Sequence, residues 1–170
     1  MVKNKKTKVT PRSVALAVLL KVLKQGKSLS QLKSDFQVLD DMRDRSLAGE
    51  ITNGVLRWRW KLDAHLSPYF KKKLKKKDID VHLILSIAVY ELIELDIPEY
   101  ATVNEAVVLV KATKKNWAKS LVNAVLRNVI RGLGESEKKL ANDEAAQYSH
   151  PLWMLDLFKK DWPSQWQNIA

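Results

Sequence analysis

Apolar residues recur along most of the chain at intervals of three and four, the spacing that places them on one face of an α-helix. The first such stretch begins near Pro11, where Thr10 is a suitable N-cap, and is stopped by Gly26. A shorter helix is expected over residues 28–38. These patterns predict that the amino-terminal part of the chain is helical.

A longer helix is expected to open at Asp40 or Asp41 and to continue in helical form up to a break or kink at Pro68. Residues 81–95, VHLILSIAVYELIEL, are apolar around most of the helical circumference, which is typical of a helix buried on all sides. Thr102 and Glu105 have capping-box spacing, so the next helix is expected to begin there.

A basic stripe is predicted on the helix that contains SLVNAVLRNVIRG, residues 120–132. Asn123, Arg127 and Arg131 recur every four residues and Lys119 precedes them, while the apolar residues of this segment occupy the opposite arc. Gly132 and Gly134 are expected to end this helix. The stripe is either merely solvated or in contact with a partner.

No segment shows sustained two-residue alternation bounded by turn signals, so the sequence predicts an all-α fold. The expected architecture is a compact helical bundle around the buried central helix, with a short helical extension at the carboxyl end. A chain of 170 residues, 46% hydrophobic, is sufficient for one such core and too short for two catalytic domains.

Positive charge is concentrated in one half of the sequence. Residues 1–80 contain 20 of the 30 Lys and Arg residues but only 8 of the 19 Asp and Glu residues. This polarity favours a polyanionic partner over a surface that only confers solubility. The lysine-rich run over residues 71–78 is expected to be exposed, and a phosphate contact there is no more favoured than simple solvation.

Several classes of site are disfavoured by composition. The chain has no cysteine, so a thiolate nucleophile or a zinc ribbon is excluded, and its three histidines are too scattered to suggest a metal site. Lys21 and Lys24 interrupt the apolar stretch that imitates a secretory signal, and no apolar run approaches the length of a membrane span. We therefore expect a cytoplasmic protein with neither a membrane nor a metal partner.

A short internal similarity relates ITNGVLR, residues 51–57, to LVNAVLR, residues 121–127. Each segment has an Asn four residues before an Arg, with a small residue, Gly54 or Ala124, after the Asn. The small residue is expected to permit close approach of a neighbouring helix, so a structural origin for the similarity is at least as plausible as a functional one.

ILSIAVYELIELDIPEYATVNEAVVLVK and KSLVNAVLR resemble the NusB family of RNA-binding all-α domains. DRSLAGEITNGVLRWRWKLD, residues 44–63, and YSHPLWML, residues 148–155, are similar to the amino-terminal NusB-like region of the RsmB/Fmu/Sun ribosomal RNA methyltransferases. The resemblance implies a basic flexible arm over residues 1–10 and a NusB-like RNA-binding domain over residues 11–142. Residues 143–170 would be a linker that leads to a methyltransferase domain.

In that family a cysteine thiolate adds to carbon six of the cytosine whose carbon five is methylated, with S-adenosylmethionine as the cofactor. This chain has no cysteine and no Gly-rich cofactor turn, so we expect it to bind RNA and not to catalyse. The favoured hypothesis is the RNA-binding domain of a 16S ribosomal RNA cytosine-5 methyltransferase. The alternatives are a stand-alone NusB-type antitermination factor and a protein-interaction module that does not bind RNA.

Candidate RNA contacts are arginines and lysines, because their fixed positive charges match phosphate and the Arg fork can hold one phosphate twice. They are Lys3, Lys5, Lys6, Lys8, Arg12, Lys119, Arg127 and Arg131, with Arg57 and Arg59 as second candidates.

Exposed tryptophans at positions 58, 60 or 117 could stack on unpaired bases, although aromatic residues at helical spacing more often pack in a core. Trp162 and Trp166 are expected to face the methyltransferase domain, whereas the role of Trp153 is left open.

Overall fold

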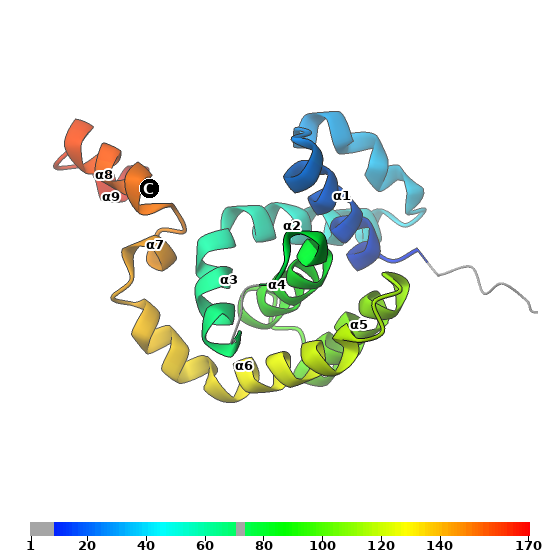
Figure 1. Cartoon of the computed structure of the whole chain (residues 1–170). Helices are drawn as coiled ribbons and strands as arrows, with labels where there is room; N and C mark the ends of the chain where they lie inside the picture. Colours follow the sequence, from blue (N-terminus) through cyan, green and yellow to red (C-terminus); the bar gives the residue numbers. More distant parts are fainter. Residues whose placement is uncertain (1–8, 71–73) are drawn as a thin grey trace, which may run out of the picture.

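A computed structural model describes residues 9–70 and 74–170, and all regular structure in these residues is helical (Figure 1). The predicted all-α class is thus confirmed. With 3₁₀ segments written η, the elements are α1 (Pro11–Gln25), η1 (Leu29–Val38), α2 (Met42–Arg57), α3 (Arg59–Leu66), η2 (Ser67–Tyr69), η3 (Lys76–Asp78), α4 (Ile79–Ile93), α5 (Glu99–Ala112), α6 (Ala118–Leu140), α7 (Glu144–Gln147), α8 (Leu152–Asp161) and α9 (Trp166–Ile169).

Helix α4 is the centre of the bundle, as its apolar circumference predicts. It packs against α1, α2, α3, α5 and α6, and every residue from Leu83 to Glu91 is buried (Figure 1). A helix surrounded in this way exposes little of its surface to water, and His82 near its start is partly exposed. The surrounding helices therefore carry most of the surfaces that are available to partners.

Helix α1 begins and ends at the residues predicted from the sequence. Thr10 and Ser13 form a reciprocal capping box, and Gly26 adopts a left-handed conformation, with φ of 66°, after the last turn. The expected short helix after Gly26 is present as the 3₁₀ segment η1, which packs against α1 and α2 through a small second core. Arg45 holds η1 to α2 by donating to the carbonyl oxygens of Leu39 and Asp40.

The predicted start of α5 was wrong. The helix begins at Glu99, with Pro98 as its N-cap, and the Thr102 amide already donates to the Pro98 carbonyl oxygen at 3.0 Å. Thr102 is fully buried within the helix and does not cap it. Proline fixes a backbone conformation suited to a helix start, and this outweighed the spacing of Thr102 and Glu105.

The predicted end of α6 was also wrong, because the helix continues through Gly132 and Gly134 to Leu140. A Cβ atom at residue 132 would lie 2.5 Å from the Tyr69 hydroxyl oxygen. Gly132 thus serves close packing against η2 and does not terminate the helix. In the similar segments 51–57 and 121–127, close packing explains the small residue only in the first. Gly54 lies against Tyr90, whereas Ala124 is exposed.

The end of the chain forms a short helical extension, as expected. α7 packs against α3 and α6, α8 packs against α7 and α9, and Figure 1 shows α8 and α9 projecting from the body at the upper left. In the described part of the chain, none of the helices combines the length and the apolar character needed to cross a membrane.

Candidate nucleic-acid interface

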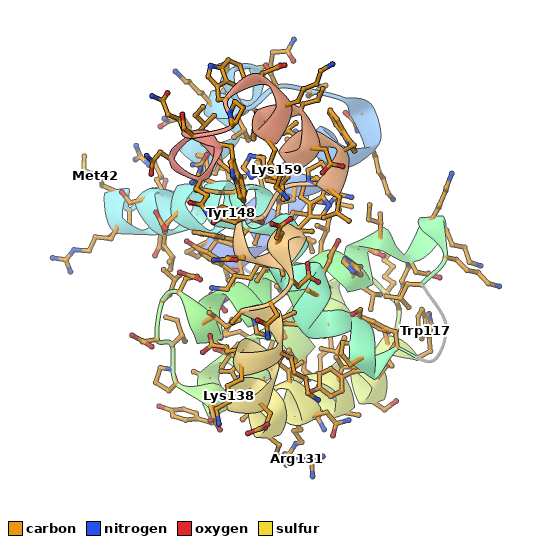
Figure 2. All side chains as sticks on the ribbon, turned by 90° about the vertical axis from the view of Figure 1, so that its left-hand side faces the viewer. Met42, Trp117, Arg131, Lys138, Tyr148 and Lys159 are labelled. Atoms are coloured by element: carbon orange, nitrogen blue, oxygen red, sulfur yellow. The ribbon has the colours of Figure 1, made fainter. Side chains whose placement is uncertain are left out.

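A groove of about 590 Å³ lies between α5 and α6 and contains part of the predicted basic stripe. Arg127 and Arg131 line one wall together with Asn123, and the apolar side chains of Val107 and Ile130 also line the groove. Figure 2 shows Arg131 extending away from the body at its lower edge. Glu99 also lines the groove. Two arginines and one carboxylate are thus combined with apolar surface, and the excess of positive charge suits a site that binds both phosphate and base.

Both arginines of the groove are exposed, and among the described residues neither forms an ion pair with a carboxylate. Instead, Arg127 Nε donates to Asn123 Oδ1 at 3.3 Å, and Arg131 Nη2 donates to Asn128 Oδ1. Neutral acceptors of this kind orient a guanidinium and leave its charge uncompensated. Both side chains thus remain available to an anion.

Lys119 is not part of the groove, although it belongs to the predicted stripe. Four residues of an α-helix turn through about 400°, so each step of four moves a side chain by about 40° around the axis. After three steps Lys119 and Arg131 are about 120° apart, and Lys119 is half-buried. The predicted stripe is therefore a spiral, of which only the later part faces the groove.

The opposite wall contains residues that the sequence did not suggest as contacts. Tyr100 is 80% exposed, and it lies in the first turn of α5 with Asn104 one turn further on. An exposed aromatic ring can stack on a base, and an amide can pair with a base edge. Both residues were missed because the misplaced helix start left Tyr100 in a supposed loop, where its alignment with Asn104 could not be recognised.

Arg12 lies inside the fold. Its Nε atom is 2.7 Å from Oε1 of Glu91 on α4, and the two side chains are 15% and 1% exposed. Burial raises the pKa of Glu91, and the adjacent Arg12 opposes this shift. The guanidinium compensates a buried carboxylate, so we leave Arg12 out of the proposed interface.

Arg57 and Arg59 flank the junction between α2 and α3 and are both exposed. Their guanidinium groups lie 5.5 Å and 5.6 Å from the ring centroids of Trp58 and Trp60, respectively. Arg59 lines a second pocket whose lining shares no residue with the groove. The structure therefore places the exposed candidate arginines at two separate locations, the groove and the α2–α3 junction.

Other predicted contacts have mixed outcomes. Lys3, Lys5, Lys6 and Lys8, together with residues 71–73 of the lysine run, lie outside the described residues. Among the candidate tryptophans, Trp58 packs against the core and Trp60 is 37% exposed. Trp117 is 53% exposed and lies at one side of the body (Figure 2).

The carboxyl-terminal extension has an inner and an outer aromatic surface. Tyr148 and Trp166 pack with ring centroids 5.0 Å apart, and Lys159 lies over the Trp166 ring and pairs with Glu144. On the outside, a set of large apolar side chains is exposed: Leu152, Trp153, Leu157, Trp162 and Ile169. Several exposed apolar side chains on one short extension are typical of an interaction surface.

The residues described here do not fit the nucleoside of S-adenosylmethionine. They form no strand, so they contain no Gly-rich strand-to-helix turn of the kind that holds such a cofactor.

Comparison with known proteins gives two consistent results. The model of the NusB family matches residues 9–131. The chain is also 35% identical over 163 residues to ribosomal RNA small subunit methyltransferase B of Pseudomonas putida, covering 95% of the chain and 37% of that relative. Its identity to the protein of the same name from Vibrio cholerae is 34% over 159 residues, covering 94% and 37%, respectively. The chain thus spans little more than a third of the length of these relatives.

Proposed function

The chain belongs to the NusB family and is homologous to the NusB-like part of ribosomal RNA small subunit methyltransferase B, and we propose on this basis that it binds ribosomal RNA for such an enzyme. The observation that carries the proposal is the α5–α6 groove, where Arg127 and Arg131 have no carboxylate partner among the described residues and face an exposed tyrosine. Its place of action would be the cytoplasm, where the RNA is assembled into ribosomes.

In this proposal, the chain binds and a separate domain catalyses. Cytosine-5 methylation needs a nucleophile and S-adenosylmethionine, and the chain contains no cysteine. A methyltransferase domain attached to this one would supply both. The bound 16S ribosomal RNA would be held by cations on rigid helices, which position a substrate better than loops do.

The RNA-binding role predicts a steep dependence of affinity on salt. Each neutralised phosphate releases counterions, so the logarithm of the binding constant falls linearly with the logarithm of the salt concentration. Replacing Arg127 and Arg131 together with glutamine is expected to make this slope shallower by about 1.5 to 2, and to weaken binding of a 16S ribosomal RNA fragment at low salt. Fluorescence anisotropy at several salt concentrations measures both quantities.

The matched control replaces Lys138 and Lys139 with glutamine. These cations are exposed near the end of the same helix and do not line the groove, so their loss is expected to leave the slope almost unchanged. Equal effects of the two double variants would show that only net charge matters. No binding by the unaltered chain at low salt would instead favour the protein-interaction alternative.

We further propose that the outer face of α8 docks the methyltransferase domain. Trp153 and Leu157 lie one helical turn apart on α8 and are 62% and 46% exposed. Trp166 packs inside the extension against Tyr148 and is left out of this surface. Tryptophans of this kind often carry a large share of an interface's binding energy.

Docking can be tested with the separately produced catalytic region of the Pseudomonas putida relative. Replacing Trp153 and Leu157 with alanine is expected to weaken binding at least thirtyfold, as for a buried tryptophan hot spot. Val38 on η1 and Met42 on α2 are also exposed apolar residues, and their replacement by alanine is the control. Figure 2 shows Met42 at the edge of the body. Isothermal titration that gives equal affinities for both double variants would contradict docking through α8.

A further inference from the structure

A second pocket, of about 540 Å³, lies between α3 and the start of α4, beside η2 and η3. Arg59 and Asp63 line it from α3, Phe70 from the end of η2, and His82 from α4. Lys75 and Lys76 also line it, and both are exposed. The α6 stripe contributes nothing to this pocket, so its chemistry needs a separate explanation.

The walls of the pocket suit a flat ring. Phe70 and His82 are stacked with an interplanar angle of 26° and ring centroids 6.2 Å apart, and neither ring is fully buried. Leu74 and Ile79 add apolar surface. Partly exposed rings in a pocket provide a stacking platform for an unpaired base, because every base has a π-face.

The charged residues of the pocket are mostly positive. Among the described residues, Arg59, Lys75 and Lys76 line the pocket as cations, and Asp63 is the only acidic residue that does so. Asp63 Oδ1 lies 3.4 Å from His82 Nε2, and the Asp63 side chain is 43% exposed. Burial raises the pKa of Asp63, while His82 and Arg59 lower it. The carboxylate is therefore held by His82 and still accessible to a ligand that donates hydrogen bonds.

From this arrangement we infer that the pocket binds a single unpaired nucleotide of RNA, with its base stacked on Phe70 or His82 and its phosphate held by Arg59, Lys75 and Lys76. The inference deepens the proposed RNA-binding function, on which its biological meaning rests. A simple anion site would need the cations without the paired rings. A purely apolar ligand would leave Asp63 and the cations without partners.

Asp63 also determines which base fits best. A carboxylate accepts hydrogen bonds, and guanine presents two adjacent donors, N1–H and the N2 amino group, on its Watson–Crick edge. Cytosine and adenine present one amino group each, whereas uracil presents one N–H between two carbonyl oxygens, which a carboxylate repels. The pocket therefore prefers guanine and discriminates most strongly against uracil.

The test uses nuclear magnetic resonance of the histidine side chains in the full chain at pH 7.5, with guanosine 5′-monophosphate, uridine 5′-monophosphate and ribose 5-phosphate as probes. Burial lowers the pKa of His82, and Asp63 opposes this shift. The His82 ring is therefore neutral at pH 7.5, where the spectra are recorded. Guanosine monophosphate is expected to shift the His82 signals until they saturate. Its dissociation constant should be about tenfold lower than that of uridine monophosphate. His150, outside the pocket, is the internal reference.

Two variants complete the test. Asp63→Asn is expected to abolish the preference for guanine over uracil, because an amide both donates and accepts. Asp44→Asn, at an exposed position of α2, should leave that preference intact. Phe70→Leu keeps an apolar side chain but removes the ring, and is expected to weaken the binding of guanosine monophosphate about tenfold. Retention of the His65 and His150 signals shows that each variant is folded.

The inference is overturned if ribose 5-phosphate shifts His82 as much as guanosine monophosphate does, if no nucleotide shifts it, or if Asp63→Asn retains the base preference. These outcomes are separate from failure of the proposed function. Replacing Arg127 and Arg131 alters the salt dependence of binding to long RNA but leaves mononucleotide binding intact, because neither residue lines this pocket.

Discussion

Replacing Arg12 with methionine is expected to lower the free energy of unfolding at pH 7 by about 3–5 kcal/mol, the cost of leaving a buried charge without its partner. The carboxylate left behind is Glu91, which is 1% exposed and lies 2.7 Å from the guanidinium. Chemical denaturation of the variant and the parent chain measures the difference. Arg43→Met removes the same kind of side chain from an exposed position on α2, and is expected to have little effect.

The loss of stability in Arg12→Met should be smaller at acidic pH than at neutral pH. Burial already raises the pKa of Glu91 above 4.5, and removing Arg12 raises it further. A group whose pKa is higher in the folded than in the unfolded state favours folding below the unfolded value, and this advantage is lost as pH rises through the folded value. The deficit of Arg12→Met should therefore be smaller at pH 5 than at pH 7.

A second variant separates the charge effect from lost packing. In Arg12→Met with Glu91→Gln no buried charge remains, so part of the lost stability should return, as replacement of a whole buried pair usually costs less than removal of one partner. If the loss in free energy of unfolding of Arg12→Met is independent of pH, or equal to that of Arg43→Met, Arg12 does not compensate the buried charge of Glu91. The pair also holds the first turn of α1 against α4.

Local patterns were sufficient to predict the fold where one physical effect dominated. The buried circumference of α4 and the caps of α1 were predicted correctly because neither depends on distant residues. The end of α6 was not, since Gly132 is explained only by Tyr69, which is far away in the sequence. The start of α5 was misplaced because Pro98 outweighed the spacing of Thr102 and Glu105. A glycine that ends a helix and one that admits a neighbouring ring look the same in one sequence.

The candidate site was predictable only as a set of charges. Arg127 and Arg131 were recognised from their spacing on one helix, but Tyr100 and Asn104 join them through the packing of α5 on α6. Arg12 was indistinguishable from a surface arginine, because its partner Glu91 is on another helix. The pocket around Asp63 and His82 likewise depends on the junction of α3 with α4, which no local pattern predicts.

Replacing Gly54 with alanine is expected to lower the free energy of unfolding by about 1–3 kcal/mol, the usual cost of overpacking a core. A Cβ atom there would lie 2.0 Å from Cζ of Tyr90. The ring cannot move aside freely, because Tyr90 is buried and its hydroxyl donates to Glu50 Oε1 at 2.6 Å. Gly49→Ala on the same helix is the matched control, and it should stabilise the chain by about 0.5–1 kcal/mol because nothing lies within 4 Å of the added atom.

The contact can be isolated by repeating both substitutions in a Tyr90→Leu background, where Gly54→Ala should cost much less. Equal effects of Gly54→Ala and Gly49→Ala in the parent chain would refute the close contact. This contact also matters for the second pocket, because α2 ends at Arg57 and leads directly into Arg59, whereas His82 belongs to α4. Separating α2 from α4 at Gly54 should therefore move Arg59 away from His82, and weaken mononucleotide binding as well as stability.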